Sequence, residues 1–135
     1  MADITTYYSG INKNKILKAV NSVLSQSKAI DEFGLIFVSV KKMTEFNKKH
    51  RGLNRPTNVL SFATKPSDEL GSGDVVVCPD VIKLEAKEYG FTQKKWMTRL
   101  IVHGILHLVG YDHQTRKREL EMKFLEEKVF DKLNI

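Results

Sequence analysis

Three segments of the chain place apolar residues at the three- and four-residue spacing of a helix that is buried on one face. The first segment begins after Asn12 or Asn14, either of which can cap it, and ends at residue 24. Its apolar residues are Ile16, Leu17, Val20, Val23 and Leu24. The second covers residues 93–109, with Thr92 placed to cap it, and the third covers about 116–133. The face expected for the third comprises Leu120, Phe124, Leu125, Val129 and Leu133.

Four shorter segments have the β-branched and aromatic composition that is typical of strands. They are residues 2–8, 33–40, 59–63 and 74–78. Two further helices are expected between and after them, over 41–50 and 80–89, because Gly52 and Gly90 supply helix ends. The sequence therefore predicts an α+β fold in which about five helices pack on a small four-stranded mixed sheet. The chain contains no repeat, linker or low-complexity segment, so we expect one domain over residues 1–135.

The composition agrees with a globular protein and excludes several classes. Hydrophobic residues make up 41% and charged residues 28% of the 135 positions, which argues against a disordered or fibrous chain. The single cysteine, Cys78, cannot form an internal disulfide, and the first ten residues lack the basic start and apolar stretch of a secretory signal. No apolar run approaches the roughly 20 residues that cross a bilayer. We therefore expect a reduced, cytoplasmic protein with no membrane partner.

The net charge favours an anionic partner. It is +6, from 22 Lys and Arg against 16 Asp and Glu, with a sequence pI of about 9.4. Within residues 41–55 the basic side chains are opposed only by Glu45. They are Lys41, Lys42, Lys48, Lys49, Arg51 and Arg55. Such a run indicates either a surface that contacts phosphates or the solvated face of a helix, and the sequence supports both interpretations equally.

The segment HGILHLVGYDH, residues 103–113, holds three of the four histidines. His103 and His107 are four residues apart, so on a helix they project from the same face. Gly110 can adopt the left-handed conformation that ends a helix, and the reversal there would bring His113 back as a third ligand. Three imidazoles with an open fourth position are typical of catalytic zinc, although Ni²⁺ and Co²⁺ also suit them. The alternative is a chance spacing of core and loop histidines. The fourth histidine, His50, lies beside Lys49 and Arg51 and is expected to be an ordinary surface residue.

The spacing of these histidines matches the extended zincin motif of metalloproteases, with one departure. Those enzymes carry a glutamate directly after the first histidine as the general base, whereas this chain has Gly104. Peptide hydrolysis by that route is therefore disfavoured. A metal ion in such a site can still act as a Lewis acid on a phosphoryl oxygen, so phosphoryl chemistry stays open.

Together with RGLNRPTNVLSF at 51–62 and GSGDVVVCPD at 71–80, the histidine segment resembles the YbeY family of bacterial metal-dependent endoribonucleases. The resemblance implies a zincin-like fold, a zinc-type site at His103, His107 and His113, and cleavage of single-stranded RNA rather than DNA. It also implies a role in maturing the 3′ end of small-subunit ribosomal RNA and in ribosome quality control. The implied partners are ribosomal RNA, the small ribosomal subunit and its assembly factors.

The resemblance also carries over to single positions. Arg51 matches the functional arginine of the family, so the implied catalytic set is Arg51 with the three histidines. A guanidinium suits that role because it stays charged and binds phosphate in a bidentate manner. Asn58 is a departure, since the family commonly has aspartate there, and a role that needs a carboxylate near the presumed cleft is in doubt.

Other residues receive weaker expectations. Ser61 could line the cleft, and Asp74 could stabilise a turn or belong to the site. Tyr111 or Asp112 could accept a hydrogen bond from a metal-binding histidine, although Asp112 could equally cap the turn. Cys78 is expected to be a buried strand residue rather than a nucleophile.

Two alternative functions remain beside the nuclease. One is a zincin-type metallopeptidase, which Gly104 disfavours. The other is a non-catalytic ribosome assembly factor in which the metal holds the loop after Gly110. The basic charge fits this second alternative as well as it fits the nuclease.

Overall fold

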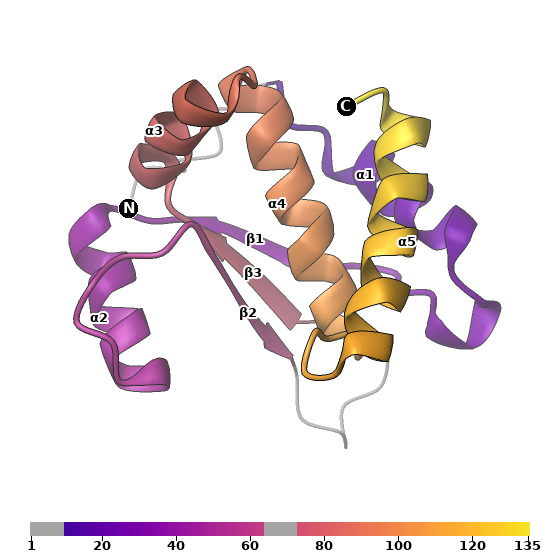
Figure 1. Cartoon of the computed structure of the whole chain (residues 1–135), viewed down its shortest axis with the longest axis horizontal. Helices are drawn as coiled ribbons and strands as arrows, with labels where there is room; N and C mark the ends of the chain where they lie inside the picture. The colour runs from indigo at the N-terminus through magenta and orange to yellow at the C-terminus, as the bar shows by residue number, and fades with distance from the viewer. Residues whose placement is uncertain (1–9, 64–72) are drawn as a thin grey trace.

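The computed structural model describes residues 10–63 and 73–135 (Figure 1). Along the chain its elements are α1 (Lys13–Val23), the 3₁₀ turn η2 (Gln26–Lys28), β1 (Gly34–Phe37), α2 (Val40–Arg51), β2 (Val59–Ala63), β3 (Gly73–Val77), α3 (Pro79–Tyr89), α4 (Gln93–Leu108) and α5 (Arg116–Leu133). The α+β class and the five helices are confirmed. The described part of the sheet has three strands where four were expected, and the strand predicted over residues 2–8 lies outside the described residues.

The helix ends follow the local signals in the sequence. The Asn12 side chain accepts a hydrogen bond from the Lys15 N–H at 3.0 Å, so Asn12 rather than Asn14 is the cap of α1. Thr92 caps α4 in the same way through the Lys95 N–H at 3.1 Å. Gly52 and Gly90 end α2 and α3 with φ of 70° and 79°, a left-handed conformation that glycine adopts without strain. In residues 10–63 and 73–135, no helix combines the length and the apolar character needed to cross a membrane.

The sheet is mixed, and helices cover both of its faces. The strand order is β1-β3-β2, with β1 parallel and β2 antiparallel to β3, so β2 is an edge among the described strands. Because side chains alternate along a strand, Val75 and Val77 point to one face and Val76 to the other. The first face packs against α4, with α1 and α5 packed on α4 and on each other, while α2 lies on the opposite side (Figure 1).

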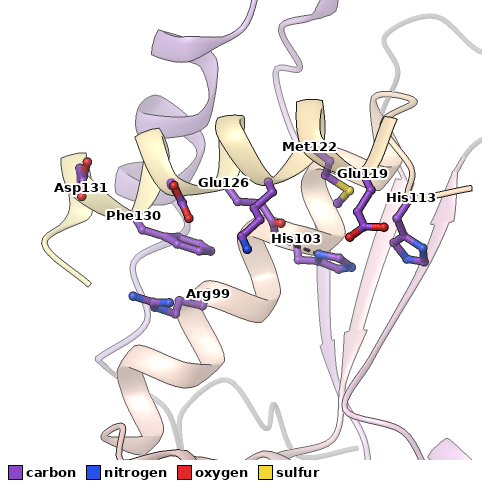
Figure 2. Close-up of a pocket in the computed structure, with 10 residues that line it drawn as sticks. Arg99, His103, His113, Glu119, Met122, Glu126, Phe130 and Asp131 are labelled. Atoms are coloured by element: carbon purple, nitrogen blue, oxygen red, sulfur yellow. Dashed lines mark hydrogen bonds and ion pairs between the residues drawn. The ribbon is translucent and has the colours of Figure 1, made fainter. Parts of the chain in front are cut away.

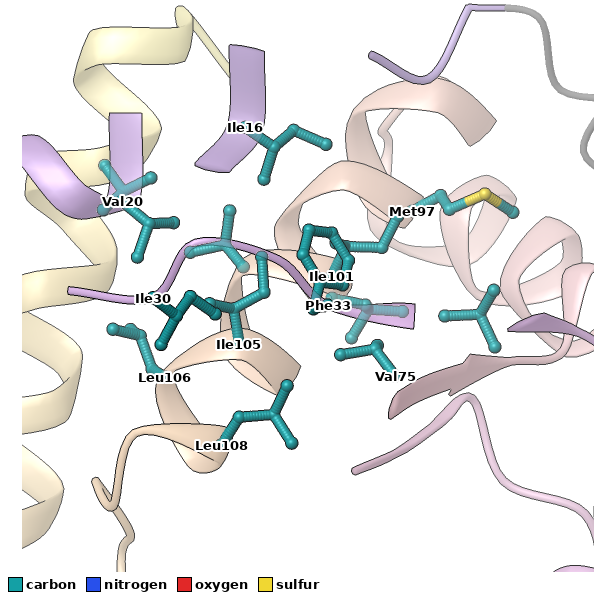
Figure 3. Close-up of a cluster of buried hydrophobic side chains, with 14 of the residues drawn as sticks. Ile16, Val20, Ile30, Phe33, Val75, Met97, Ile101, Ile105, Leu106 and Leu108 are labelled. Atoms are coloured by element: carbon teal, nitrogen blue, oxygen red, sulfur yellow. The ribbon is translucent and has the colours of Figure 1, made fainter. Parts of the chain in front are cut away.

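The main core lies between this first face and α1, α4 and α5 (Figure 3). Phe33, just before β1, is 1% exposed and sits among fully buried side chains of α4 such as Ile101 and Ile105. The apolar face of α1 buries Ile16 and Val20 as predicted. A smaller cluster on the second face of the sheet contains Met43, Leu60, Val76 and Cys78.

The apolar face predicted for α5 is partly wrong. Leu120 and Phe124 are 49% and 59% exposed, whereas Met122 is 1% exposed. Side chains two residues apart on a helix point in directions about 200° apart. When Met122 and Val129 face the core, Leu120 and Phe124 therefore face solvent. The charged residues around Met122 gave no sequence signal for this rotation of the helix.

Helix α4 approaches the sheet closely at Gly104. A Cβ atom there would lie 2.8 Å from Val75 Cγ1 and 2.9 Å from Ser61 Oγ, both nearer than real Cβ contacts. The Ser61 hydroxyl donates a hydrogen bond to the Gly104 carbonyl at 2.9 Å, which ties the edge strand to the helix. The absence of a side chain at residue 104 therefore sets the distance between α4 and strands β2 and β3.

We expect Gly104→Ala to lower the free energy of unfolding by about 1–3 kcal/mol, because the new methyl group overpacks the contact with Val75 and Ser61. Helix propensity alone would act in the opposite direction, by about 1 kcal/mol. Urea unfolding measures the sign of this change in the free energy of unfolding. The double variant Ser61→Ala/Gly104→Ala should lose less than the single one, and a single variant more stable than the wild type would contradict the close packing.

Candidate metal centre

The loop after α4 reverses the chain at Gly110. This glycine has φ of 102°, and the N–H groups of Gly110 and Tyr111 donate to the carbonyls of His107 and Leu106 at 3.1 and 3.0 Å. The Asp112 carboxylate accepts hydrogen bonds from the Gln114 N–H at 3.1 Å and from Arg118 at 3.2 Å. Asp112 therefore stabilises the turn, the second of its two expected roles. The reversal returns the chain past the end of α4 before α5 begins.

The structure brings His103, His107 and His113 together. One possible ligand nitrogen from each ring lies within 4.8 Å of the others, so the group could hold a metal ion. The Nε2 atoms of His103 and His107 are 3.1 Å apart. Ligand nitrogens about 2.05 Å from a tetrahedral ion are separated by about 3.3 Å, so this pair already has a suitable spacing. The ring of His113 is exposed and on a loop, and it can close the remaining difference by a small movement.

Glu126 of α5 orients the first ligand. Its Oε2 atom lies 2.8 Å from His103 Nδ1, and the carboxylate side chain is only 17% exposed (Figure 2). A proton on Nδ1 that is donated to Glu126 leaves the Nε2 lone pair free to face His107. Tyr111 and Asp112 were the residues expected in this role, and Glu126 was not predicted. No local signal in the sequence marks Glu126, because its partner lies 23 residues earlier in the chain.

Burial lowers the pKa of His107 from its ordinary value of 6.5, and positive charge on His103 and His113 lowers it further. Glu126 and Asp112 act in the opposite direction but more weakly. The neutral imidazole is the form that binds a metal. The fold therefore holds His107 in its ligating state.

A groove of about 570 Å³ extends from the histidines between α4 and α5 (Figure 2). Four carboxylates line it, from Glu119, Glu126, Glu127 and Asp131, against two cations, Arg99 and Lys123. The guanidinium of Arg99 is held in place, since it lies 4.5 Å from the Phe91 and Phe130 rings and donates to the carbonyl oxygen of Ile135. This side of the site is acidic, which favours a cation and disfavours a phosphate chain.

Arg51 lies at the end of α2, the helix that packs on the other face of the sheet from α4. It is the exposed last residue of α2, and no hydrogen bond or ion pair in the described part of the chain joins it to a histidine. Two consecutive residues of β2 connect the two sides. Ser61 contacts Gly104, next to His103, and the Phe62 ring lies 4.7 Å from the ring of His50, next to Arg51. The edge of β2 therefore separates the arginine from the histidines.

Asn58, the position where the family commonly has aspartate, contacts helix α3. Its Nδ2 donates to Glu85 Oε1 at 2.9 Å, and Trp96 Nε1 donates to the same oxygen at 3.0 Å. An aspartate here would put a second carboxylate beside Glu85, so the amide is the better partner. Asn58 thus ties the start of β2 to α3.

The remaining candidates have structural surroundings. Cys78 is fully buried as expected, and burial raises the pKa of its thiol, which makes a nucleophilic role unsuitable. Tyr111 packs against the main core, and Lys28 Nζ lies 4.3 Å from the centre of its ring. Asp74 is exposed on β3. The Ser61 hydroxyl is bonded to the carbonyl of Gly104, and Ser61 is not among the residues that line the groove between α4 and α5.

Comparison with known proteins gives one family. A family model described as Endoribonuclease YbeY matches residues 4–134. An Endoribonuclease YbeY of Bartonella henselae is 38% identical over 126 residues, covering 90% of this chain and 80% of the relative. One of Acholeplasma laidlawii is 35% identical over 120 residues, covering 89% and 85%. A solution structure of a Thermotoga maritima protein superposes with a TM-score of 0.60 at 27% identity, covering 99% of this chain and 88% of that one.

Removal of the Glu126 carboxylate should weaken metal binding although no ligand is touched. We expect Glu126→Leu to bind Zn²⁺ about 10- to 100-fold more weakly, because Nδ1 of His103 loses its acceptor. Glu126→Gln, which keeps an acceptor oxygen, should lose less. Competition with a chromophoric chelator measures the affinity. Glu127→Gln, on the same helix and lining the same groove, is the control, and equal losses in Glu127→Gln and Glu126→Leu would argue against a specific role.

The lowered pKa of His107 predicts a pH-dependent stability of the metal-free chain. As pH falls below 6.5, unfolded His107 takes up a proton while the folded form does not, so the folded state loses stability. This loss is complete below the lowered folded-state pKa. Urea unfolding in chelator across this window should show a steeper decline for the wild type than for His107→Gln. Parallel curves would contradict the assignment.

Proposed function

Because the chain belongs to the YbeY endoribonuclease family, we propose that it cleaves single-stranded RNA at a metal centre formed by His103, His107 and His113. The convergence of three imidazoles at the reversed end of α4 is the observation that supports this. The natural substrate in this proposal is the 3′ end of small-subunit ribosomal RNA. The proposed setting is ribosome maturation and quality control in the cytoplasm, with the small subunit and its assembly factors as partners.

The proposed chemistry divides between the histidines and Arg51. His103, His107 and His113 would hold a divalent ion such as Zn²⁺, which would supply Lewis acidity for a phosphoryl oxygen. The protein contributes a neutral His107 and a His103 that Glu126 orients. Arg51 binds the phosphate with its guanidinium and stabilises the negative charge that develops during displacement. It does so from across the β2 edge, so the RNA backbone spans this edge.

The same geometry argues against a peptidase. Gly104 offers no carboxylate to act as a base, and its contacts with Val75 and Ser61 leave no room for one. The endoribonuclease relatives favour an enzyme over the non-catalytic assembly factor. We also propose that the architecture is zincin-like, because the three histidines lie at and just after the end of α4. We further propose that residues 1–135 form one domain.

Single-stranded RNA of defined sequence tests this proposal. We expect His107→Ala to lose cleavage and Arg51→Ala to fall by about 100-fold, the effect of removing one charge-stabilising group. Chelation should abolish wild-type activity, and readdition of metal should restore it. Lys87→Ala, a loss of one exposed cation on α3, is the matched control and should cut at the wild-type rate. Cleavage retained by both His107→Ala and Arg51→Ala would refute the assignment.

A further inference from the structure

A cluster of aromatic rings lies beside the last turn of α2. Phe46 and His50 are one helical turn apart, and the ring of Phe62 from β2 lies 4.7 Å from His50 and 6.0 Å from Phe46, centre to centre. Phe46 and Phe62 are half-buried and anchor the cluster to the smaller core, whereas His50 is exposed. The cluster is therefore rigid at its base and presents an aromatic ring to solvent. We call these three residues the aromatic step.

Positive charge surrounds the aromatic step. Lys48, Lys49 and Arg51 flank His50 in sequence, and all three are exposed. The one acidic residue of α2, Glu45, pairs with Lys42 at 3.6 Å. Among the residues that the structure describes, no ion pair occupies Lys48, Lys49 or Arg51, so their charge is available to an anion.

The aromatic step and the histidines meet at one strand. The neighbouring residues Ser61 and Phe62 point to opposite faces of β2, the first toward α4 and the second toward His50. Because β2 pairs on one side only among the described strands, a ligand can pass over its open edge from one face to the other. A chain held at the histidines and at Arg51 must follow this route.

The charges on the two sides of β2 indicate which kind of ligand binds along this route. The groove between α4 and α5 is rich in carboxylates, whereas the α2 side is basic. A polyanion is therefore repelled from the first and attracted to the second. A flat ring among cations is the arrangement that binds single strands, because bases stack on the ring while Lys and Arg contact the phosphates.

We propose that the aromatic step and the flanking cations bind the segment of single-stranded RNA next to the scissile phosphate, with one base stacked on His50. This inference rests on the proposed endoribonuclease function and adds a binding surface to it. Specificity for single strands follows, because a base that is paired in a duplex cannot leave its neighbours to stack on a side chain.

The stacked base can be located with 2-aminopurine, whose fluorescence falls when it stacks. A set of RNA oligonucleotides with this base at successive positions is bound to the His107→Ala chain, so that the RNA stays intact. We expect quenching at one position, lost in His50→Ala/His107→Ala and kept in His50→Tyr/His107→Ala, which retains a ring. The affinity measured by fluorescence anisotropy should fall about tenfold for the alanine variant, the contribution of one stacked base.

The cations are tested by the salt dependence of the same binding. Lys48→Gln/Lys49→Gln should lower the slope of log K against log salt concentration by about 1.4, the value for two lost phosphate contacts on a single strand. Lys83→Gln/Lys87→Gln, with the same charge loss on α3, is the matched control and should leave the slope unchanged.

Cleavage by the otherwise wild-type chain separates this inference from the proposed function. If the wild type cuts RNA but the His50 and Lys48/Lys49 variants bind and quench as their parents do, the inference is overturned, and an acidic protein becomes the partner of this surface. If the wild type neither binds nor cuts RNA, the proposed function fails and the inference with it. Wild-type cutting together with the expected losses supports both.

Discussion

The close packing of α4 on the sheet at Gly104 is the constraint on which the site depends. Because residue 104 has no side chain, Val75 and Ser61 touch the helix backbone directly, and this contact fixes the rotation of α4. With Gly104 turned toward the strands, its neighbour His103 and the residue one turn later, His107, are half-buried beside this contact. The residue that stands where the protease motif has its base thus also helps to set the direction of the two histidines.

The second organising feature is the separation of charge across the site. The α5 side supplies carboxylates, of which one orients His103, and the α2 side supplies cations and an exposed ring. A metal ion and a polyanionic substrate need opposite surroundings, and the edge strand β2 lies between the two. The net charge of +6 hides this division, because it sums over both sides.

The sequence predicted the features that depend on local spacing. The pairing of His103 with His107, the reversal at Gly110 and the caps at Asn12 and Thr92 all follow from residues within one or two turns of each other. Glu126 could not be found in this way, because its partner is 23 residues earlier in the chain and only the docking of α5 joins them.

The apolar face of α5 was misplaced for a related reason. Leu120 and Phe124 satisfy helical spacing as well as Met122 does, and tertiary contacts alone choose between the two faces. The contact of Asn58 with Glu85, 27 residues later in the chain, had no local signal in the sequence either.

The hydrogen bond between His103 and Glu126 makes the histidine cluster dependent on two parts of the chain that are distant in sequence. All three histidines lie at or before residue 113, yet His103 is oriented by α5, which docks through Met122 and Val129. A cavity made at Val129, beneath α5, would therefore loosen the carboxylate that orients His103 without touching any of the three imidazoles. Inactivating changes in such a protein need not map to the residues that perform its chemistry.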